Sequence, residues 1–413
     1  MRYAMCSAEN LSLGPAYVMG FLRSQGHEVK LFFDPLKYDM EDYNVIKIRE
    51  YKPDAVLFSC LTAHYQWALG MARKVKNMVG CKIIFGGIHP TTVPEVVREN
   101  DFIDDVCVGD GMAYFGGKFE PDRIFPERED YFKVLPPIHR IHPYILTSFD
   151  CPFRCTYCGP KIKMPRRSVE GCIDELAMLK RGGARRFTIW DDVFTVDKAW
   201  LMRFLAQYRR EIKLPFKCIS HVKFLNDEIM QELKAAKCFS IDIGIQTGSG
   251  ELRRAILNRY ETNEEFLKAC ALIRKYRMSL FIDHIFGLPY DNDGYEQKSY
   301  DLYKQAKPSM VNGYGLVYFP KTKIIDHAIE AGILKQGDIY KIERGEMPKY
   351  TTVVDNKWLK NILAVPFKSK IWEHLPTWFI KLALYLKIRQ DFPIQFVIWD
   401  KIYFTWRRMW LAS

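Results

Sequence analysis

The chain has 413 residues, of which 48% are hydrophobic and 27% charged, and this excludes a disordered or fibrous protein and allows two domains. The formal net charge of +12 favours an acidic partner such as a phosphorylated substrate, an anionic lipid surface or nucleic acid, although a merely solvated basic surface is equally compatible with it. The first residues lack the basic flank and apolar core of an export signal, and no uncharged apolar run is long enough to span a membrane. We therefore expect a cytoplasmic protein whose eleven cysteines are ligands or buried apolar residues.

Residues 1–115 alternate helix-like and strand-like segments. Helices are predicted at 14–25, 44–51 and 64–78, and strands at 29–33, 54–59, 82–85 and 105–108. This alternation predicts a doubly wound, Rossmann-like parallel sheet. Ligands bind such sheets at the carboxyl ends of the strands, which here are 59–64, 86–92 and 109–112.

A second α/β series follows a linker at 116–143 that is rich in proline and charge. Its six predicted strands, separated by helices, lie at 144–148, 186–190, 217–221, 240–246, 279–286 and 310–318. Six strand–helix units predict a partial TIM-like (β/α)6 barrel over 144–335. The chemistry of such barrels takes place at the C-terminal ends of their strands.

The last segment, 336–413, is expected to be mostly helical and is rich in aromatic and basic residues. It holds six of the nine tryptophans, Trp358, Trp372, Trp378, Trp399, Trp406 and Trp410, interleaved with lysine and arginine. One interpretation is that helices at 375–386 and 392–410 lie in a membrane interface, which would give the protein a peripheral membrane contact. The other is that the aromatic side chains cover the open side of the barrel and line the substrate pocket. Both interpretations favour a large apolar or lipid-like substrate.

Three closely spaced cysteines, Cys151, Cys155 and Cys158, follow the first strand of the predicted barrel in a CxxxCxxC pattern. Thiolates hold iron–sulfur clusters, and three ligands leave one iron of a four-iron cluster open, much as a catalytic zinc keeps an open position. The alternative is a zinc site or three buried cysteines, but the region offers no fourth ligand at the spacing usual for zinc.

This loop, with the aromatic Tyr157 before its last cysteine, resembles the motif of the radical S-adenosylmethionine (SAM) superfamily. The resemblance implies a 4Fe–4S cluster whose open iron chelates SAM. An electron from the cluster, supplied by a reductant such as flavodoxin or ferredoxin, would then yield a 5′-deoxyadenosyl radical that abstracts hydrogen.

Further segments extend the resemblance over most of 145–335. Residues 187–194 resemble a second-strand motif near the SAM amino group, and 241–249 resemble a fourth-strand GIESGS motif with Gln246 in place of Glu. Residues 281–289 resemble a fifth-strand segment that packs on adenine, and 318–322 a PGT turn. The SAM pocket implied in this way contains Tyr157, Asp191, Asp192, Ser220, Gln246, His284 and Gly287. The two aspartates could instead be helix caps or surface charges.

Residues 11–112 resemble the cobalamin-binding domain that is fused to one class of these enzymes. The resemblance implies corrin contacts at Ser59, Thr62, His64, Gly86, Gly87, His89 and Gly109, where small residues at strand ends let a flat ligand approach the backbone. The cobalt-ligating DxHxxG motif is absent, and the chain after Gly111 is short for a usual helix. A lone histidine in a loop, such as His64 or His89, is more often a polar residue at the protein surface than a ligand.

The implied reaction is methyl transfer from methylcobalamin to an unactivated carbon of a small-molecule or lipid-like substrate. A cyclase or rearrangement enzyme with a vestigial first domain and no cobalamin is the alternative. An RNA-modifying enzyme would need an RNA-binding module, and the sequence contains no recognisable one, so no nucleic acid partner is expected. A non-catalytic metal-binding or membrane-associated scaffold is the remaining interpretation.

Overall fold

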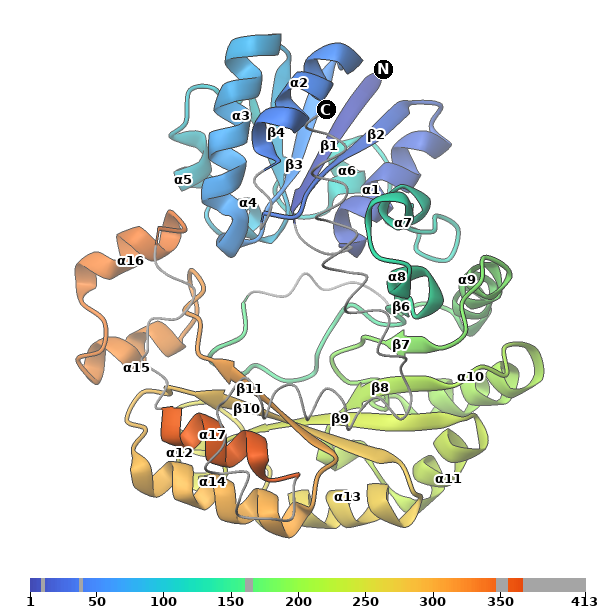
Figure 1. Ribbon diagram of the computed structural model, residues 1–413, viewed down its shortest axis with the longest axis vertical. Helices are drawn as coiled ribbons and strands as arrows, with labels where there is room; N and C mark the ends of the chain where they lie inside the picture. The colour runs from blue at the N-terminus through green and yellow to red at the C-terminus, as the bar shows by residue number, and fades with distance from the viewer. Residues whose placement is uncertain (9–11, 37–39, 160–165, 347–355, 367–413) are drawn as a thin grey trace.

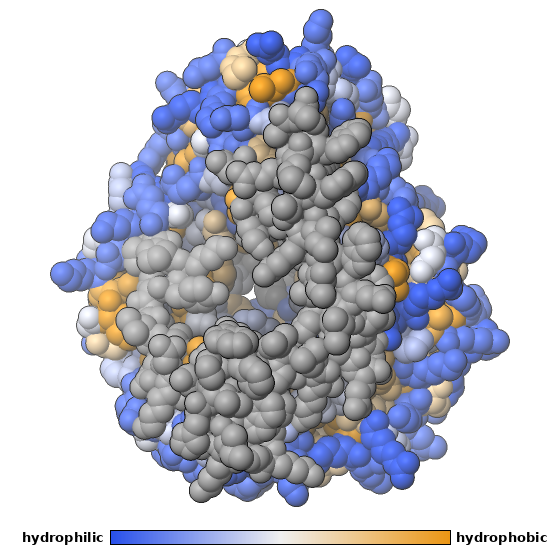
Figure 2. Space-filling view, in the orientation of Figure 1, coloured by the Kyte–Doolittle hydropathy of each residue, from blue (hydrophilic) through white to orange (hydrophobic). Residues whose placement is uncertain are grey.

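Two parallel β-sheets, one in each half of the chain, form the framework of the computed structural model (Figure 1). The structure describes residues 1–8, 12–36, 40–159, 166–346 and 356–366. The first sheet lies at one end of the molecule, and the second sheet curves across the other end with helices outside it (Figure 1). Around the rim of the face seen in Figure 2, the described residues are mostly hydrophilic.

The first sheet has five parallel strands in the order β2-β1-β3-β4-β5. They are β1 (Arg2–Ala8), β2 (Glu28–Asp34), β3 (Ala55–Ser59), β4 (Lys82–Gly86) and β5 (Asp105–Val106). Helices α2 (Glu41–Tyr51) and α3 (Tyr65–Val79) pack on one face, and α1 (Leu13–Ser24) packs on the other. The predicted doubly wound sheet is thereby confirmed.

Strand β1 was not predicted from the sequence, although it lies inside the sheet between β2 and β3. Ala4 and Cys6 on one face and Tyr3 and Met5 on the other are all buried. A strand that is buried on both faces has no polar–apolar alternation, so periodicity does not distinguish it from other short apolar runs.

The segment between the two sheets, 116–143, contains the short helices α7 (Glu129–Val134) and α8 (Ile138–Ile141) and packs onto α1. Tyr131 is fully buried against the first sheet, and the backbone N–H of Glu127 donates to the carbonyl of Ala16. Gly20 permits this approach, because a Cβ there would lie 2.5 Å from the carbonyl oxygen of Phe125.

The second sheet has six parallel strands in sequential order, β6 to β11, and confirms the predicted partial barrel. They are β6 (Tyr144–Ile145), β7 (Phe187–Ile189), β8 (Phe216–Ser220), β9 (Cys238–Gln246), β10 (Ser279–Phe286) and β11 (Met310–Gly315). On the outside lie α9 (Val169–Arg181), α10 (Lys198–Glu211), α11 (Asp227–Ala235), α13 (Asn263–Lys275) and α14 (Asp293–Ala306) (Figure 1). Each begins at a side-chain cap, namely Ser168, Asp197, Asn226, Thr262 and Asn292.

After the barrel, α15 (Ile324–Glu330) and α16 (Gln336–Glu343) lie to one side, and the chain beyond α16 contacts the first domain, where Arg344 pairs with Glu99. Helix α17 (Asn356–Ala364) then packs beside α14 and β11. There the buried Trp358 donates its indole N–H to Asp293 at 2.8 Å. The other five C-terminal tryptophans and the helices predicted at 375–386 and 392–410 lie outside the described residues. Within the described residues, no helix is long and apolar enough to cross a bilayer.

Candidate active site

The cysteine loop begins just after β6. Its three cysteine side chains are more exposed than most of the other cysteines of the chain. Cys151 and Cys155 are half-buried and Cys158 is exposed, whereas seven of the other eight cysteines are buried. The backbone turns back on itself here, because the N–H of Cys158 donates to the carbonyl of Cys155 at 3.2 Å. Within the described ranges, no three His, Cys, Asp or Glu side chains form a compact site for a single metal ion.

Thr156, in the middle of the loop, anchors it to two distant segments. Its N–H donates to the carbonyl of Leu257, and its hydroxyl donates to the carbonyl of Ile256 at 2.5 Å. Its own carbonyl accepts from the N–H of Ile324 at the start of α15. The loop is therefore anchored at Thr156, between Cys155 and Cys158, to residues 256–257 and to the start of α15.

Arg259 is a residue of this site that the sequence analysis missed. Its guanidinium lies 3.9 Å from the sulfur of Cys155 and 3.4 Å from the hydroxyl oxygen of Tyr157, and it donates to the carbonyl of Gly244 at 2.5 Å. The pKa of Cys155 falls to about 6, because the hydrogen bond from Cys158, together with the charge and hydrogen bond of Arg259 and the hydrogen bond from Tyr157, outweighs the effect of burial. A thiol that ionises this readily suits a metal-binding role, since the thiolate is the ligand form.

Glu261 and His221 extend this polar network to the end of β8, and the sequence analysis missed both. Glu261 accepts from Arg259 at 2.6 Å and lies 3.5 Å from a ring nitrogen of His221. Burial alone would raise the pKa of Glu261, but the hydrogen bond from His221 and the charge of Arg259 lower it to about 2. The His221 ring also stacks on Phe153 of the cysteine loop, with ring centres 4.2 Å apart. No motif connects these residues in sequence, so only the folded chain shows the network.

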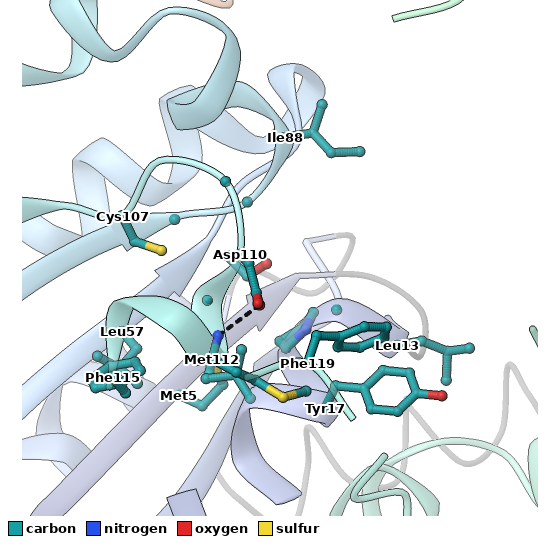
Figure 3. A pocket seen from close by; sticks show the side chains of 18 of the residues that line it. Met5, Leu13, Tyr17, Leu57, Ile88, Cys107, Asp110, Met112, Phe115 and Phe119 are labelled. Atoms are coloured by element: carbon teal, nitrogen blue, oxygen red, sulfur yellow. Dashed lines mark hydrogen bonds between the residues drawn. The ribbon is translucent and has the colours of Figure 1, made fainter. Parts of the chain in front are cut away.

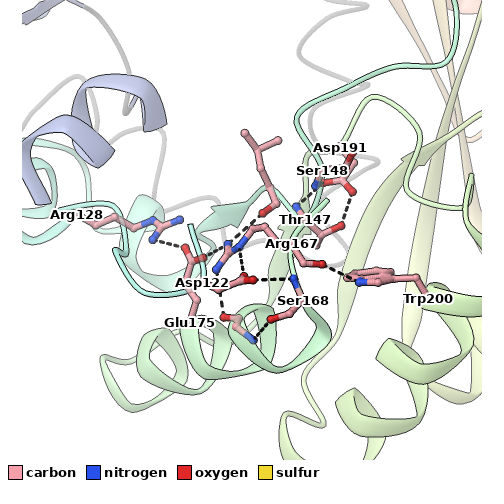
Figure 4. Close-up of polar contacts among 11 residues, drawn as sticks. Asp122, Arg128, Thr147, Ser148, Arg167, Ser168, Glu175, Asp191 and Trp200 are labelled. Atoms are coloured by element: carbon pink, nitrogen blue, oxygen red, sulfur yellow. Dashed lines mark hydrogen bonds and ion pairs between the residues drawn. The ribbon is translucent and has the colours of Figure 1, made fainter. Parts of the chain in front are cut away.

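Asp191, at the end of β7, holds the chain that leads into the cysteine loop (Figure 4). Its buried carboxylate accepts from the backbone N–H of Thr147 at 2.6 Å and from the Thr147 hydroxyl at 2.5 Å. It also accepts from the N–H of Ser148 and lies 3.6 Å from Arg166. The structure thus gives Asp191 a positioning role, whereas the neighbouring Asp192 is exposed.

Three further residues were predicted to line the SAM pocket, namely Gln246, Gly287 and Ser220. The Gln246 amide folds over Gly244, where a Cβ would lie 2.2 Å from its nitrogen, and both Gln246 and Gly287 have positive φ. Ser220 is buried, and its hydroxyl lies 2.5 Å from that of Thr195.

His284 does not lie on the inner face of the barrel. Its fully buried ring packs toward α14, 2.9 Å from the hydroxyl oxygen of Tyr303 and 3.2 Å from a carboxylate oxygen of Glu296. Burial lowers the pKa of His284 to about 3, so the ring is neutral at physiological pH. The expected role of His284 in a SAM pocket is therefore corrected to one of supporting β10 from behind.

An apolar cavity of about 240 Å³ opens at the carboxyl end of the first sheet (Figure 3). Four of the predicted cobalamin contacts line it, namely Ser59, Gly86, Gly87 and Gly109. Its wall also includes residues that the sequence analysis did not select, among them Leu13, Tyr17, Met112, Phe119, Leu146 and Phe149. Gly14 and Gly109 leave open space where a Cβ would stand, so the cavity fits the flat, apolar part of a large ligand.

The other three predicted cobalamin contacts are not among the described lining residues. His89 is fully buried 3.1 Å from the Thr62 hydroxyl, with its ring centre 4.1 Å from that of Tyr65, and burial lowers its pKa to about 4. His64 closes the short 3-10 helix Thr62–His64. The structure therefore makes His89 a core residue.

Comparisons with known proteins agree with both halves of this geometry. The B12 binding domain family matches residues 8–116, and the radical SAM superfamily matches residues 145–302. Cytidylyl-2-hydroxyethylphosphonate methyltransferase from Streptomyces wedmorensis is 19% identical, over 79% of this chain and 78% of its own.

Solved structures share the fold. TsrM from Kitasatospora setae, a radical SAM methyltransferase solved with cobalamin and a [4Fe-4S] cluster, gives a TM-score of 0.64 at 16% identity, over 78% of this chain and 77% of its own. The cobalamin-dependent radical SAM enzyme OxsB gives a TM-score of 0.63 at 15% identity, over 83% of this chain and 57% of its own. The chain belongs to the radical SAM superfamily, in the class that carries an N-terminal B12-binding domain, and it is an enzyme.

Proposed function

We propose that this enzyme transfers a methyl group to an unactivated carbon of a small molecule. Cys151, Cys155 and Cys158 would hold a 4Fe–4S cluster, and cobalamin would occupy the cavity of the first domain. When bound, the cluster and SAM supply a 5′-deoxyadenosyl radical that abstracts hydrogen, and methylcobalamin supplies the methyl group. The reducing electron would come from a flavodoxin- or ferredoxin-type protein.

The observation that carries this proposal is the shared wall of the two sites. Leu146 and Phe149, which lead into the cysteine loop, also line the cavity at the end of the first sheet. A ligand in that cavity would therefore lie next to the strand end from which the cysteines project. Methyl transfer to a carbon radical needs such proximity, because the two reacting centres must meet without diffusion.

The residues of the chain have definable roles in this proposal. Arg259 favours the thiolate of Cys155, and Thr156 and Asp191 fix the loop that carries the cysteines. The mostly apolar side chains that line the cavity would favour the apolar part of a ligand over water. We expect a substrate with a substantial apolar part, since Trp190 and Tyr314 leave large ring surfaces exposed at the end of β7 and on β11.

The decisive experiment is SAM cleavage by anaerobically reconstituted protein with a strong reductant. We expect the wild type to form 5′-deoxyadenosine and Cys155→Ala to lose both iron and product. Cys238→Ala is the matched control, because Cys238 is buried in the barrel core, away from the loop, and its removal should leave the iron content unchanged. An iron-loaded wild type that forms no 5′-deoxyadenosine would refute the proposal.

A further inference from the structure

Two aspartates face the inside of the barrel on neighbouring strands. On β9, Ile241 and Ile243 pack with the outer helices, so Asp242 between them points to the opposite face. On β10, Ile282 and His284 point outward in the same way, so Asp283 points inward. The register sets Asp242 opposite Phe281 and Asp283 opposite Gly244, and the two carboxyls are therefore diagonal neighbours.

One of these carboxyls is supported and the other is left with an unpaired oxygen. Asn312, directly opposite Asp283 on β11, donates its amide N–H to the Asp283 carboxylate at 2.9 Å. Asp242 is only 8% exposed, and its Oδ1 accepts no hydrogen bond from an N–H or hydroxyl group of the described residues, so that the carboxyl of Asp283 is the neighbour with which Asp242 can share a proton. Because buried carboxyl oxygens are normally hydrogen-bonded, this atom indicates a place for a donor that the described chain does not supply.

The nearby cation is held against aromatic rings. The ammonium of Lys217 on β8 lies 5.6 Å from the ring centre of Trp190 and 5.7 Å from that of Phe281. Its charge favours ionisation of both aspartates, yet burial and the charge of Asp283 still raise the pKa of Asp242 to about 7. Near neutral pH the two carboxyls can therefore share a proton while remaining strong acceptors.

The pair lies deeper in the barrel than the expected SAM contacts. Gln246 stands about 10 Å further along the sheet than Asp242, toward the end where the cysteine loop lies, because the stretch equals the three residues of β10 from Phe281 to His284 at a rise of about 3.3 Å each. Tyr314 on β11 and Trp190 at the end of β7 flank this inner face, with 53% and 52% of their surfaces exposed. A molecule that lies between SAM and the floor of the barrel would meet both the aromatic rings and the carboxyls.

We propose that Asp242 and Asp283 bind a hydrogen-bond-donating group of the substrate, an ammonium or a hydroxyl, while Trp190 and Tyr314 contact its apolar part. This inference rests on the proposed function only in calling the bound molecule the substrate. It replaces a uniformly apolar, lipid-like substrate by one with a polar donor at its buried end. Anionic groups are disfavoured at this end, because two carboxyls would face them.

Fragment binding tests this inference without any cofactor. Benzylamine, benzyl alcohol and benzoate share one ring and differ in the polar group, and ligand-observed saturation-transfer NMR on the folded full-length chain ranks their affinities. We expect benzylamine or benzyl alcohol to bind at least about tenfold more tightly than benzoate, since benzoate cannot donate to a carboxylate. The comparison between benzylamine and benzyl alcohol distinguishes an ammonium from a hydroxyl site.

Substitutions locate the binding. Asp242→Asn and Asp283→Asn keep the side-chain shape and should weaken the preferred fragment about tenfold, as expected for loss of a charge-assisted hydrogen bond. Asp174→Asn, on the exposed surface of α9, should change nothing. Benzoate binding as tightly as the donors in the wild type would overturn the inference even if neither variant folds, and so would folded variants that bind as the wild type does. Neither result depends on SAM cleavage, so failure of the proposed methyl transfer is a separate outcome.

Discussion

Asp191 and Thr147 join the end of β7 to the chain that leads into the cysteine loop, through two hydrogen bonds to one buried carboxylate. Asp191→Ala leaves the N–H groups of Thr147 and Ser148 and the charge of Arg166 without this acceptor. We expect a loss of about 3 kcal/mol in the free energy of unfolding, the usual range for removing one partner of buried charged groups. Urea unfolding of the wild type and the variant measures this loss in the free energy of unfolding.

The same variant should also load less iron, because the start of the cysteine loop loses its support. Asp174→Ala is the matched control, since that side chain is exposed on α9. Equal unfolding midpoints for Asp191→Ala and the control would show that the Asp191 contacts contribute nothing to stability.

Cys155 should ionise more readily than an ordinary cysteine thiol in the cluster-free protein. Its pKa is lowered to about 6 by the hydrogen bond from Cys158 and by Arg259. Alkylation by iodoacetamide, followed site by site with mass spectrometry, should therefore rise with a midpoint near pH 6, because only the thiolate reacts. Arg259→Gln should move this midpoint upward, whereas the exposed Arg254→Gln should not. A midpoint near the ordinary cysteine value in the wild type would contradict the assignment.

Glu175 lies in a buried ionic network between the segment 116–143 and the barrel (Figure 4). It pairs with Arg128 at 2.5 Å and with Arg167, which in turn contacts Asp122. Glu175→Gln leaves the buried guanidinium of Arg128 without its carboxylate and leaves Arg167 with Asp122 alone, and we expect it to cost about 3 kcal/mol near neutral pH. Urea unfolding at several pH values provides the measurement.

The pH dependence follows from the sign of the pKa shift. Burial would raise the pKa of Glu175, but Arg128 and Arg167 hold it below its ordinary value of 4.5. A carboxyl with a lowered pKa stabilises the fold above its unfolded pKa and loses that contribution as the pH falls through its folded pKa. The stability difference between wild type and Glu175→Gln should thus be full above pH 4.5 and shrink in more acidic solution. A difference that grows on acidification would contradict this network.

Gly14 offers a test of the cobalamin cavity that does not strain the backbone. It lines the cavity on α1, and nothing lies within 4 Å of where its Cβ would stand. Gly14→Leu should fill the cavity and reduce the corrin absorbance that remains with the protein after gel filtration, with little change in unfolding midpoint. Gly337→Leu has similar open space on α16, away from the cavity, and should retain the corrin. Equal retention by both variants would place cobalamin elsewhere.

The sequence alone was sufficient for the two α/β domains, for eight of the eleven strands to within about two residues and for the family, because these depend on local signals. Apolar runs bounded by turns and caps recur wherever a strand or helix of this fold must form. The cysteine spacing is local in the same sense, since all three residues lie on one loop. Strand β1 was missed for the reason that its two buried faces remove the alternation on which the prediction depends.

The surroundings of the loop were decided only by the tertiary structure. Arg259 approaches Cys155, and Glu261 approaches His221, across separations in sequence that no motif spans. His89 was predicted as a site residue because it follows a strand, and His284 because its strand resembles a motif of the family. The direction of each side chain depends on which neighbouring helix or ring packs against it. No sequence pattern connects Asp242 and Asp283, which lie in two apolar strands. The strand register alone makes them neighbours. The local sequence therefore specifies which helices and strands form, whereas tertiary packing decides which side chains come into contact.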